Sequence, residues 1–191
     1  MNFETFYKHL DGYVPLSSAL KAYLRIALKD HDLKDNEFLD ASFRNLYPVI
    51  FVRRGILKTK LESKLDPGKK ILRFYFEGSL LPNLIEKDIE DFTLEISGIN
   101  ETTVLLISEG HTQNLYKLFP EFNQLITKLL DEIIMEHLHQ TLDIHHLKGE
   151  DRLKSLLKKY PNIFQIATVT DIAASMGMHA NTLSALKNKE L

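Results

Sequence analysis

The chain has 191 residues, of which 44% are hydrophobic, no cysteine and a formal net charge of −2. This length suits one large domain or a medium domain with a small one. The lack of cysteine excludes disulfides, thiolate zinc sites, cysteine-ligated iron–sulfur clusters and cysteine nucleophiles. Because no apolar run approaches a membrane span and residues 1–13 do not resemble a signal peptide, we expect a cytoplasmic protein without a membrane partner.

The first part of the chain combines a helix with short strands. Apolar residues up to about Leu28 follow near-helical spacing, with start signals at Pro15 and Ser17. Short apolar or alternating runs then follow at 48–52, 56–61, 71–76, 92–96 and 103–107. This rhythm predicts a small antiparallel barrel or sandwich. The turn signals between the runs are Arg54-Gly55, Asp66-Pro67-Gly68, Glu77-Gly78 and Gly98-Ile99-Asn100.

A long helix is predicted over residues 121–146, where apolar residues recur at three- and four-residue steps. Ile126, Leu130 and Ile134 widen the apolar stripe, so we expect it to pack on its own domain and on a second copy of the chain. A helix packed entirely within its own domain is the alternative. The residues assigned to a homodimer seam are Phe122, Leu125, Leu129 and Ile133.

Residues 169–191 predict a helix-turn-helix, which follows a further helix at 150–160 and Pro161. Ala173 is small enough for two helices to cross closely, and Gly177 can leave the right-handed helical region without a Cβ penalty. An ordinary helical hairpin is the alternative. The inner positions of the motif are Ile172, Ala173, Met176, Met178, Leu183 and Leu186.

The C-terminal part is also the basic part of the chain. From Lys148 to Leu191, seven lysines and arginines stand against four acidic residues. The remaining 147 residues hold 17 basic and 22 acidic residues. A basic surface at the end that carries the helix-turn-helix favours contact with nucleic acid.

In this order of elements the chain resembles the Crp/Fnr superfamily of bacterial transcription regulators, and within it a short branch of the Bacteroidetes type. The resemblance is strongest at 152–161 and 169–189, and weaker at 51–55 and 74–78. It implies an α+β fold with a double-stranded β-helix, a jelly-roll-like β-roll of the cyclic-nucleotide-binding type, over 1–118. A long dimerisation helix over 119–147 and an all-α helix-turn-helix domain over 148–191 would follow. The implied partners are double-stranded DNA, a second copy and a small-molecule effector.

The family's nucleotide cassette departs from its usual pattern in this chain. The Gly-Glu pair of the family falls at Pro82 and Asn83, and its phosphate-binding Arg falls near Asp91 or Phe92. A phosphate would lose its bidentate partner and meet the acids of 86–91, so we expect no cyclic AMP binding. We therefore expect the barrel either to hold another small molecule or to serve only as a scaffold. The implied effector pocket consists of Gly78, Pro82, Asn83, Asp91, Phe92 and Thr93.

The recognition helix also departs from the family, because the usual Glu and Arg fall at Asn181 and Ala185. Asparagine can pair with adenine, serine can bond to either base edge, and lysines suit phosphates. The DNA-contacting residues implied by the resemblance are His179, Asn181, Thr182, Ser184, Ala185, Lys187, Asn188 and Lys189.

Two other functions stay open. One is a Crp-like module that has lost DNA reading and acts through protein partners, and the other is a cupin-like, small-molecule-binding barrel enzyme. Only His31 and His111 flank the barrel, without a ligand cluster, and the sequence contains no catalytic motif, so we expect no enzyme. We also expect no metal, because no pair among the late histidines has the i, i+4 spacing that aligns two ligands. Those residues are His137, His139, His145 and His146.

Overall fold

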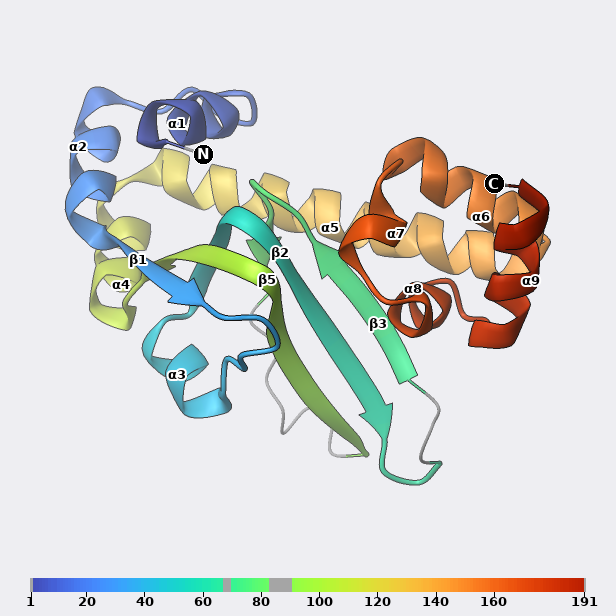
Figure 1. Ribbon diagram of the computed structural model, residues 1–191. Coiled ribbons are helices and arrows are strands. Elements are labelled where there is room, and N and C mark those ends of the chain that lie inside the picture. Colours follow the sequence, from blue (N-terminus) through green and yellow to red (C-terminus); the bar gives the residue numbers. More distant parts are fainter. Residues whose placement is uncertain (1, 67–69, 83–90, 191) are drawn as a thin grey trace.

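The computed structural model describes residues 2–66, 70–82 and 91–190. Asn83, most of the acidic stretch 86–91 and two residues of the predicted turn at 66–68 therefore lie outside the described residues. The chain begins with two short helices and continues into an antiparallel sheet. A long helix then runs behind the sheet to a group of C-terminal helices at the opposite end of the molecule (Figure 1).

Two helices stand where the sequence indicates one helical region. The side chain of Asn2 caps α1 (Phe3–Asp11) and that of Ser17 caps α2 (Ser18–Ala27). Residues 12–17 separate them, because Pro15 and a second N-cap favour a new start over continuation. Both helices bury their apolar faces in a core shared with the long helix.

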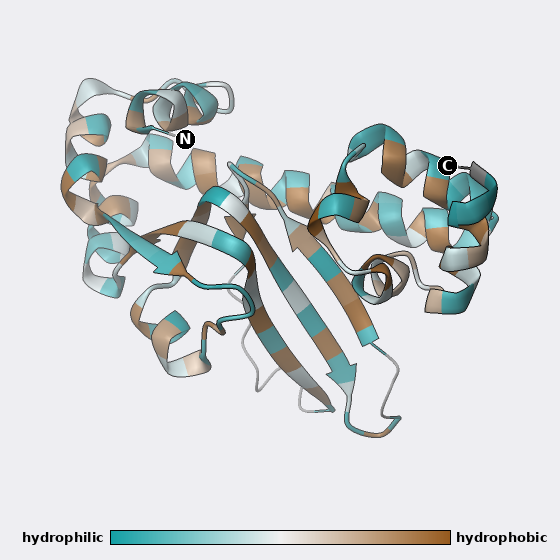
Figure 2. Cartoon of the chain, in the orientation of Figure 1, coloured by the Kyte–Doolittle hydropathy of each residue, from teal (hydrophilic) through white to brown (hydrophobic). Residues whose placement is uncertain are grey.

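The sheet is antiparallel, with strand order β1-β5-β2-β3, and β4 pairs with β2 off this path. Hydrophilic and hydrophobic residues alternate along much of the long strands (Figure 2), whereas residues 49–52 and 104–107 are buried on both faces of the sheet, between two cores. A short helix, α3 (Ala41–Leu46), lies between β1 and β2 in the sequence. The strands are β1 (Leu28–Leu33), β2 (Val49–Ser63), β3 (Lys70–Tyr75), β4 (Leu80–Leu81) and β5 (Phe92–Ile107).

Four of the expected short strands are joined into two long ones. The runs at 48–52 and 56–61 form β2, and those at 92–96 and 103–107 form β5. The glycine and asparagine that signal turns instead sit at irregularities within the strands: Gly55 has φ 84° and Asn100 has φ 56°. The register between β2 and β5 shifts on both sides of Arg54. Bulges use the same residue types as turns, so local sequence does not distinguish the two.

The long helix α5 (Pro120–His146) is confirmed, and α4 (Glu109–Leu118) leads into it. The residues assigned to the dimer seam lie in or against the core of the protomer. Phe122, Leu125 and Leu129 are at most 3% exposed within their own chain, in the core shared with α1 and α2, and Ile133 packs against that core. Side chains that fill the protomer's own interior cannot also meet a second copy.

The C-terminal helices form a compact unit with its own core. They are α6 (Gly149–Lys159), α7 (Ile163–Ile166), α8 (Val169–Ser175) and α9 (Ala180–Glu190). The core combines Leu153 and Ile163 with the predicted inner residues Ile172, Ala173 and Leu183. Among the described residues, no helix combines the length and the apolar character that a membrane crossing requires.

Candidate nucleic-acid interface

The turn between α8 and α9 is built by the residues that the sequence indicates. Gly177 has φ 63°, a left-handed conformation that favours glycine. Its N–H donates to Ala174 O (3.2 Å), and Met178 N–H donates to Ala173 O (3.0 Å). These two bonds satisfy carbonyls that the end of α8 leaves free, which is the Schellman arrangement of a helix C-terminus. The chain therefore turns sharply into α9.

The helix α9 presents one apolar and one polar face. Leu183 is fully buried against α8, and Leu186 packs at the edge of the same core. Lys187 is half-buried, with its Nζ 4.6 Å from the centre of the Phe164 ring. The other residues assigned to DNA contact are exposed, and they are His179, Asn181, Thr182, Ser184, Ala185, Asn188 and Lys189.

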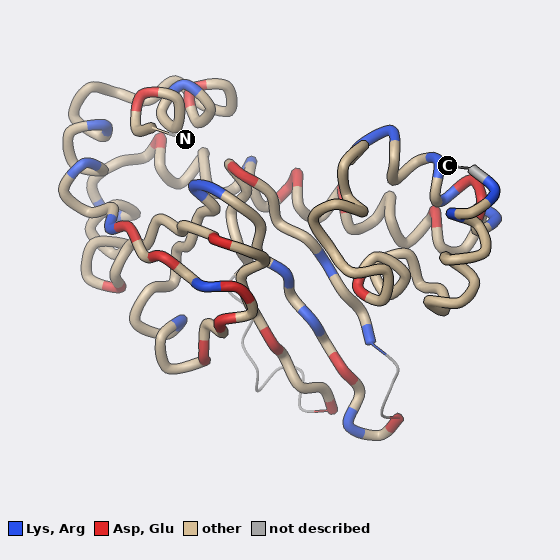
Figure 3. The backbone as a smooth tube through the Cα atoms, in the orientation of Figure 1, with Lys and Arg blue, Asp and Glu red and all other residues tan. Residues whose placement is uncertain are grey.

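Lysine and arginine gather on the C-terminal helices (Figure 3). The helix α9 lies at the outer side of this unit, away from the sheet (Figure 1). Lys187 and Lys189 fall in its last turn, where cations also complement the helix dipole. The arrangement leaves the polar face of α9 and these cations accessible to a polyanion.

The opposite side of the C-terminal unit packs on the edge strand β3. Lys58 Nζ lies 3.1 Å from Asp171 Oδ2 in a pair that is largely buried, and this pair joins β2 to the first turn of α8. The rings of Phe76 and Tyr160 stack with centres 4.1 Å apart. Burial raises the pKa of Tyr160 to about 12. These contacts join the C-terminal unit to the sheet.

The residues assigned to the effector pocket are not brought together. Gly78 is buried at one end of β2, where its N–H donates to Val52 O (2.8 Å), and a Cβ there would stand 2.9 Å from His9 Nε2. Phe92 pairs with Ser63 at the other end of β2. Asp91, Phe92 and Thr93 are exposed, Pro82 is half-buried, and Asn83 is outside the described residues.

The structure instead forms a cleft of about 500 Å³ between β3, α5 and the C-terminal unit. Its basic residues come from three distant segments of the chain, and they are Arg73, His137, His139, Arg152 and Lys159. Sequence reasoning missed this cleft, because no motif or spacing connects β3 with α6. In the sequence, only the run Phe74-Tyr75-Phe76 indicates the cleft, and such a run is equally typical of a strand that packs in a hydrophobic core. Within the described residues, no group of three or more potential ligands could hold a metal ion.

No protein-family model matches this sequence, and no curated protein matches it. Solved structures do match. A candidate transcriptional regulator of the Crp/Fnr family from Eubacterium rectale is 17% identical, with a TM-score of 0.68 over 93% of this chain and 87% of that chain. The c-di-GMP-responsive global regulator CLP of Xanthomonas campestris is 11% identical, with a TM-score of 0.67 over 91% of each chain.

The chain has the Crp/Fnr-type fold. A cyclic nucleotide-binding domain containing protein from Listeria monocytogenes matches as well, with 12% identity and a TM-score of 0.62 over 97% of this chain and 88% of that chain. The expected resemblance and fold class are confirmed, because the likeness spans the sheet, the long helix and the C-terminal helices together. Because the sequence identities to these structures are low, the similarity concerns the fold alone.

Proposed function

We propose that the protein is a DNA-binding transcription regulator of the Crp/Fnr type. The single observation that carries this proposal is α9, whose buried Leu183 fixes the helix while its polar face is exposed. A helix held in this way can enter the major groove, with its side chains reaching base edges. Within this proposal, residues 1–118 form the sensor, 119–147 the dimerisation helix and 148–191 the DNA-binding domain.

We also infer that the regulator is a homodimer formed along α5, through a stripe other than the one the sequence suggested. Four apolar side chains follow at four-residue steps on its outer face and are 38–61% exposed. An apolar stripe of this length on a helix is typical of a helix–helix seam, and a two-fold dimer brings the same stripe from both copies together. The stripe consists of Leu130, Ile134, Leu138 and Leu142.

The proposed DNA binding predicts that the purified protein retards a subset of genomic fragments, with an affinity that falls steeply as salt rises. Asn181→Ala should weaken binding to the selected fragment by about 5- to 150-fold, because a bidentate contact with adenine contributes about 1–3 kcal/mol. Asn45→Ala, an exposed asparagine in α3, serves as the matched control and should bind as the wild type does. If no fragment is retarded at low salt, a module that acts through protein partners replaces this proposal.

We further propose that the cassette does not take cyclic AMP, because the position of the family's phosphate-binding Arg holds Asp91 or Phe92. Cyclic AMP should therefore leave the melting temperature of an Arg73→Gln variant unchanged, a background in which the basic cleft beside β3 has lost a cation that could pair with the phosphate. A nucleotide bound at a hundred times its Kd would stabilise the fold by about 2.7 kcal/mol, which is roughly 5–10 °C for a chain of this size. A rise of that order in a thermal melt would contradict this interpretation of the cassette.

A further inference from the structure

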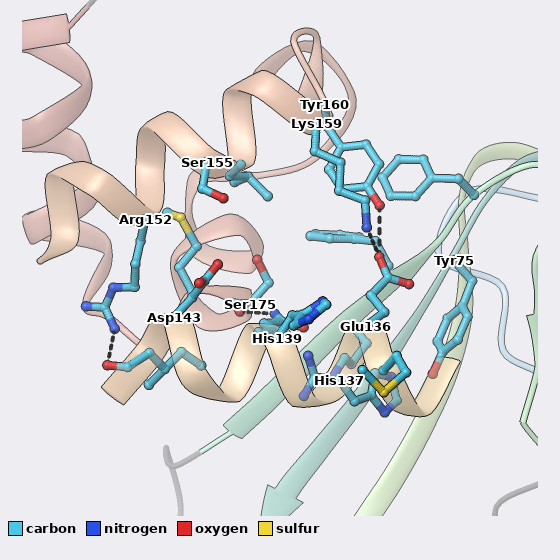
Figure 4. A pocket seen from close by; sticks show the side chains of 18 of the residues that line it. Tyr75, Glu136, His137, His139, Asp143, Arg152, Ser155, Lys159, Tyr160 and Ser175 are labelled. Carbon is cyan, nitrogen blue, oxygen red and sulfur yellow. Dashed lines mark hydrogen bonds and ion pairs between the residues drawn. The ribbon is translucent and has the colours of Figure 1, made fainter. Parts of the chain in front are cut away.

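The cleft between β3, α5 and the C-terminal unit has the size and the lining of a small-molecule site. Its volume of about 500 Å³ falls within the range of known ligand pockets. Aromatic rings line it from both sides, with Phe74, Tyr75 and Phe76 on the sheet and Tyr160 beside α6. Figure 4 shows Tyr75 on the sheet side, Glu136 and His137 on α5 below, and Tyr160 above. Met135 and Leu156 add apolar surface.

Two arginines that line this cleft carry buried nitrogens without a partner. Within the described residues, Arg73 Nη1 and Arg152 Nε are shielded from solvent and make no hydrogen bond. Arg152 is anchored elsewhere, because its Nη1 donates to Ile144 O (3.1 Å). Burial lowers the pKa of Arg73, and desolvation together with the nearby charge of Arg73 lowers the pKa of His137. A buried guanidinium nitrogen without a partner is costly, so an anion that accepted a hydrogen bond from Arg73 Nη1 would be stabilising there.

The acidic residues of the cleft are largely engaged with other groups. Glu136 accepts a short hydrogen bond from Lys159 and a second one from the Tyr160 hydroxyl at 3.4 Å. Glu132 accepts a short hydrogen bond from the Tyr13 hydroxyl. Asp143 lies six residues after His137, which is about 9 Å along the helix axis. Arg73, beside His137, is therefore the cation that a ligand could neutralise.

We propose that this cleft binds a small organic anion with an aromatic body, whose carboxylate or phosphate pairs with Arg73. The body of the ligand would lie against the edge of the stacked Phe76–Tyr160 pair and against the apolar side chains of the cleft, where an edge-to-face ring contact is favourable. The ligand would touch β3, α5 and α6 at once, so its binding would be coupled to the orientation of the C-terminal unit. No described residue of the nucleotide cassette lines this cleft.

Calorimetric titration with phenyl phosphate and with phenylacetate tests the site, and neutral 2-phenylethanol is the matched uncharged probe. At least one anion should bind, and the alcohol should bind at least about tenfold more weakly, because a charge-assisted hydrogen bond is lost. Arg73→Gln should weaken anion binding by a similar factor. Arg54→Gln, at an exposed arginine of β2, should leave it unchanged. Without ligand, Arg73→Gln should melt no lower than the wild type, because the shielded Nη1 of this half-buried arginine has no partner to lose.

Ser155→Phe provides a second variant, since this exposed α6 residue lines the cleft and a phenyl ring there would occupy part of it without altering Arg73. It should weaken binding of the anion. The proposal is overturned if neither anion binds at millimolar concentration, if the alcohol binds equally well, or if either cleft variant binds as the wild type does. A marked loss of stability in Arg73→Gln would also overturn it, because Arg73 would then be structural. These titrations and melts contain no DNA, so their outcomes do not depend on whether the protein retards DNA fragments.

Discussion

Ile134→Glu is expected to convert the protein from a dimer into a monomer. Ile134 is 61% exposed in the protomer and lies in the stripe with Leu130, Leu138 and Leu142. In a two-fold dimer each seam residue occurs twice, and each buried apolar side chain contributes about 1.5–3 kcal/mol. The substitution should therefore weaken the dimer by roughly a hundredfold or more, before the repulsion between the two carboxylates is added.

Sedimentation equilibrium over a range of concentrations measures this effect directly. Ala22→Glu places the same charge on an exposed position of α2, far from the stripe, and should remain a dimer. The monomeric variant should also lose most of its DNA affinity, because one recognition helix then reads only one half-site. A wild type that remains monomeric at high concentration, or an Ile134→Glu variant that stays dimeric, would refute the seam on this face of α5.

Leu183→Ala is expected to destabilise the C-terminal unit by about 2–5 kcal/mol, the cost of a large-to-small change in a packed core. Leu183 is fully buried and joins α9 to Leu153, Ile163 and Ile172. The sheet has its own core, made of residues such as Val52, Leu57 and Val104, so it should be less affected. DNA retardation should fall with the population of ordered α9.

Hydrogen exchange resolves the two regions separately. Amides in α8 and α9 should exchange roughly thirtyfold faster or more in Leu183→Ala, while those of β5 change little. Leu46→Ala removes the same group from a side chain that is 64% exposed, and it should shift stability by no more than about 0.5 kcal/mol. Equal acceleration in α9 and β5 would mean that the C-terminal unit does not unfold separately from the sheet.

Sequence alone predicted the elements whose signals are local. The helix α5 follows from its long 3.6-residue period, and the turn after α8 follows from Gly177 between two apolar faces. The polar residues on the outer face of α9 could be assigned in the same way, once Leu183 was placed inside. In each case residues a few positions apart decide the local structure, because helical geometry brings them to one face.

Only the tertiary structure decided which apolar face of α5 is internal and where a ligand could bind. Both stripes of α5 are apolar, and Phe122, Leu125 and Leu129 are internal because α1 and α2 cover them, which their own spacing does not reveal. Likewise, Arg73 and Arg152 belong to one cleft only because the C-terminal unit packs on β3. Contacts between residues that are far apart in sequence depend on how whole elements pack, and local periodicity does not reveal that packing.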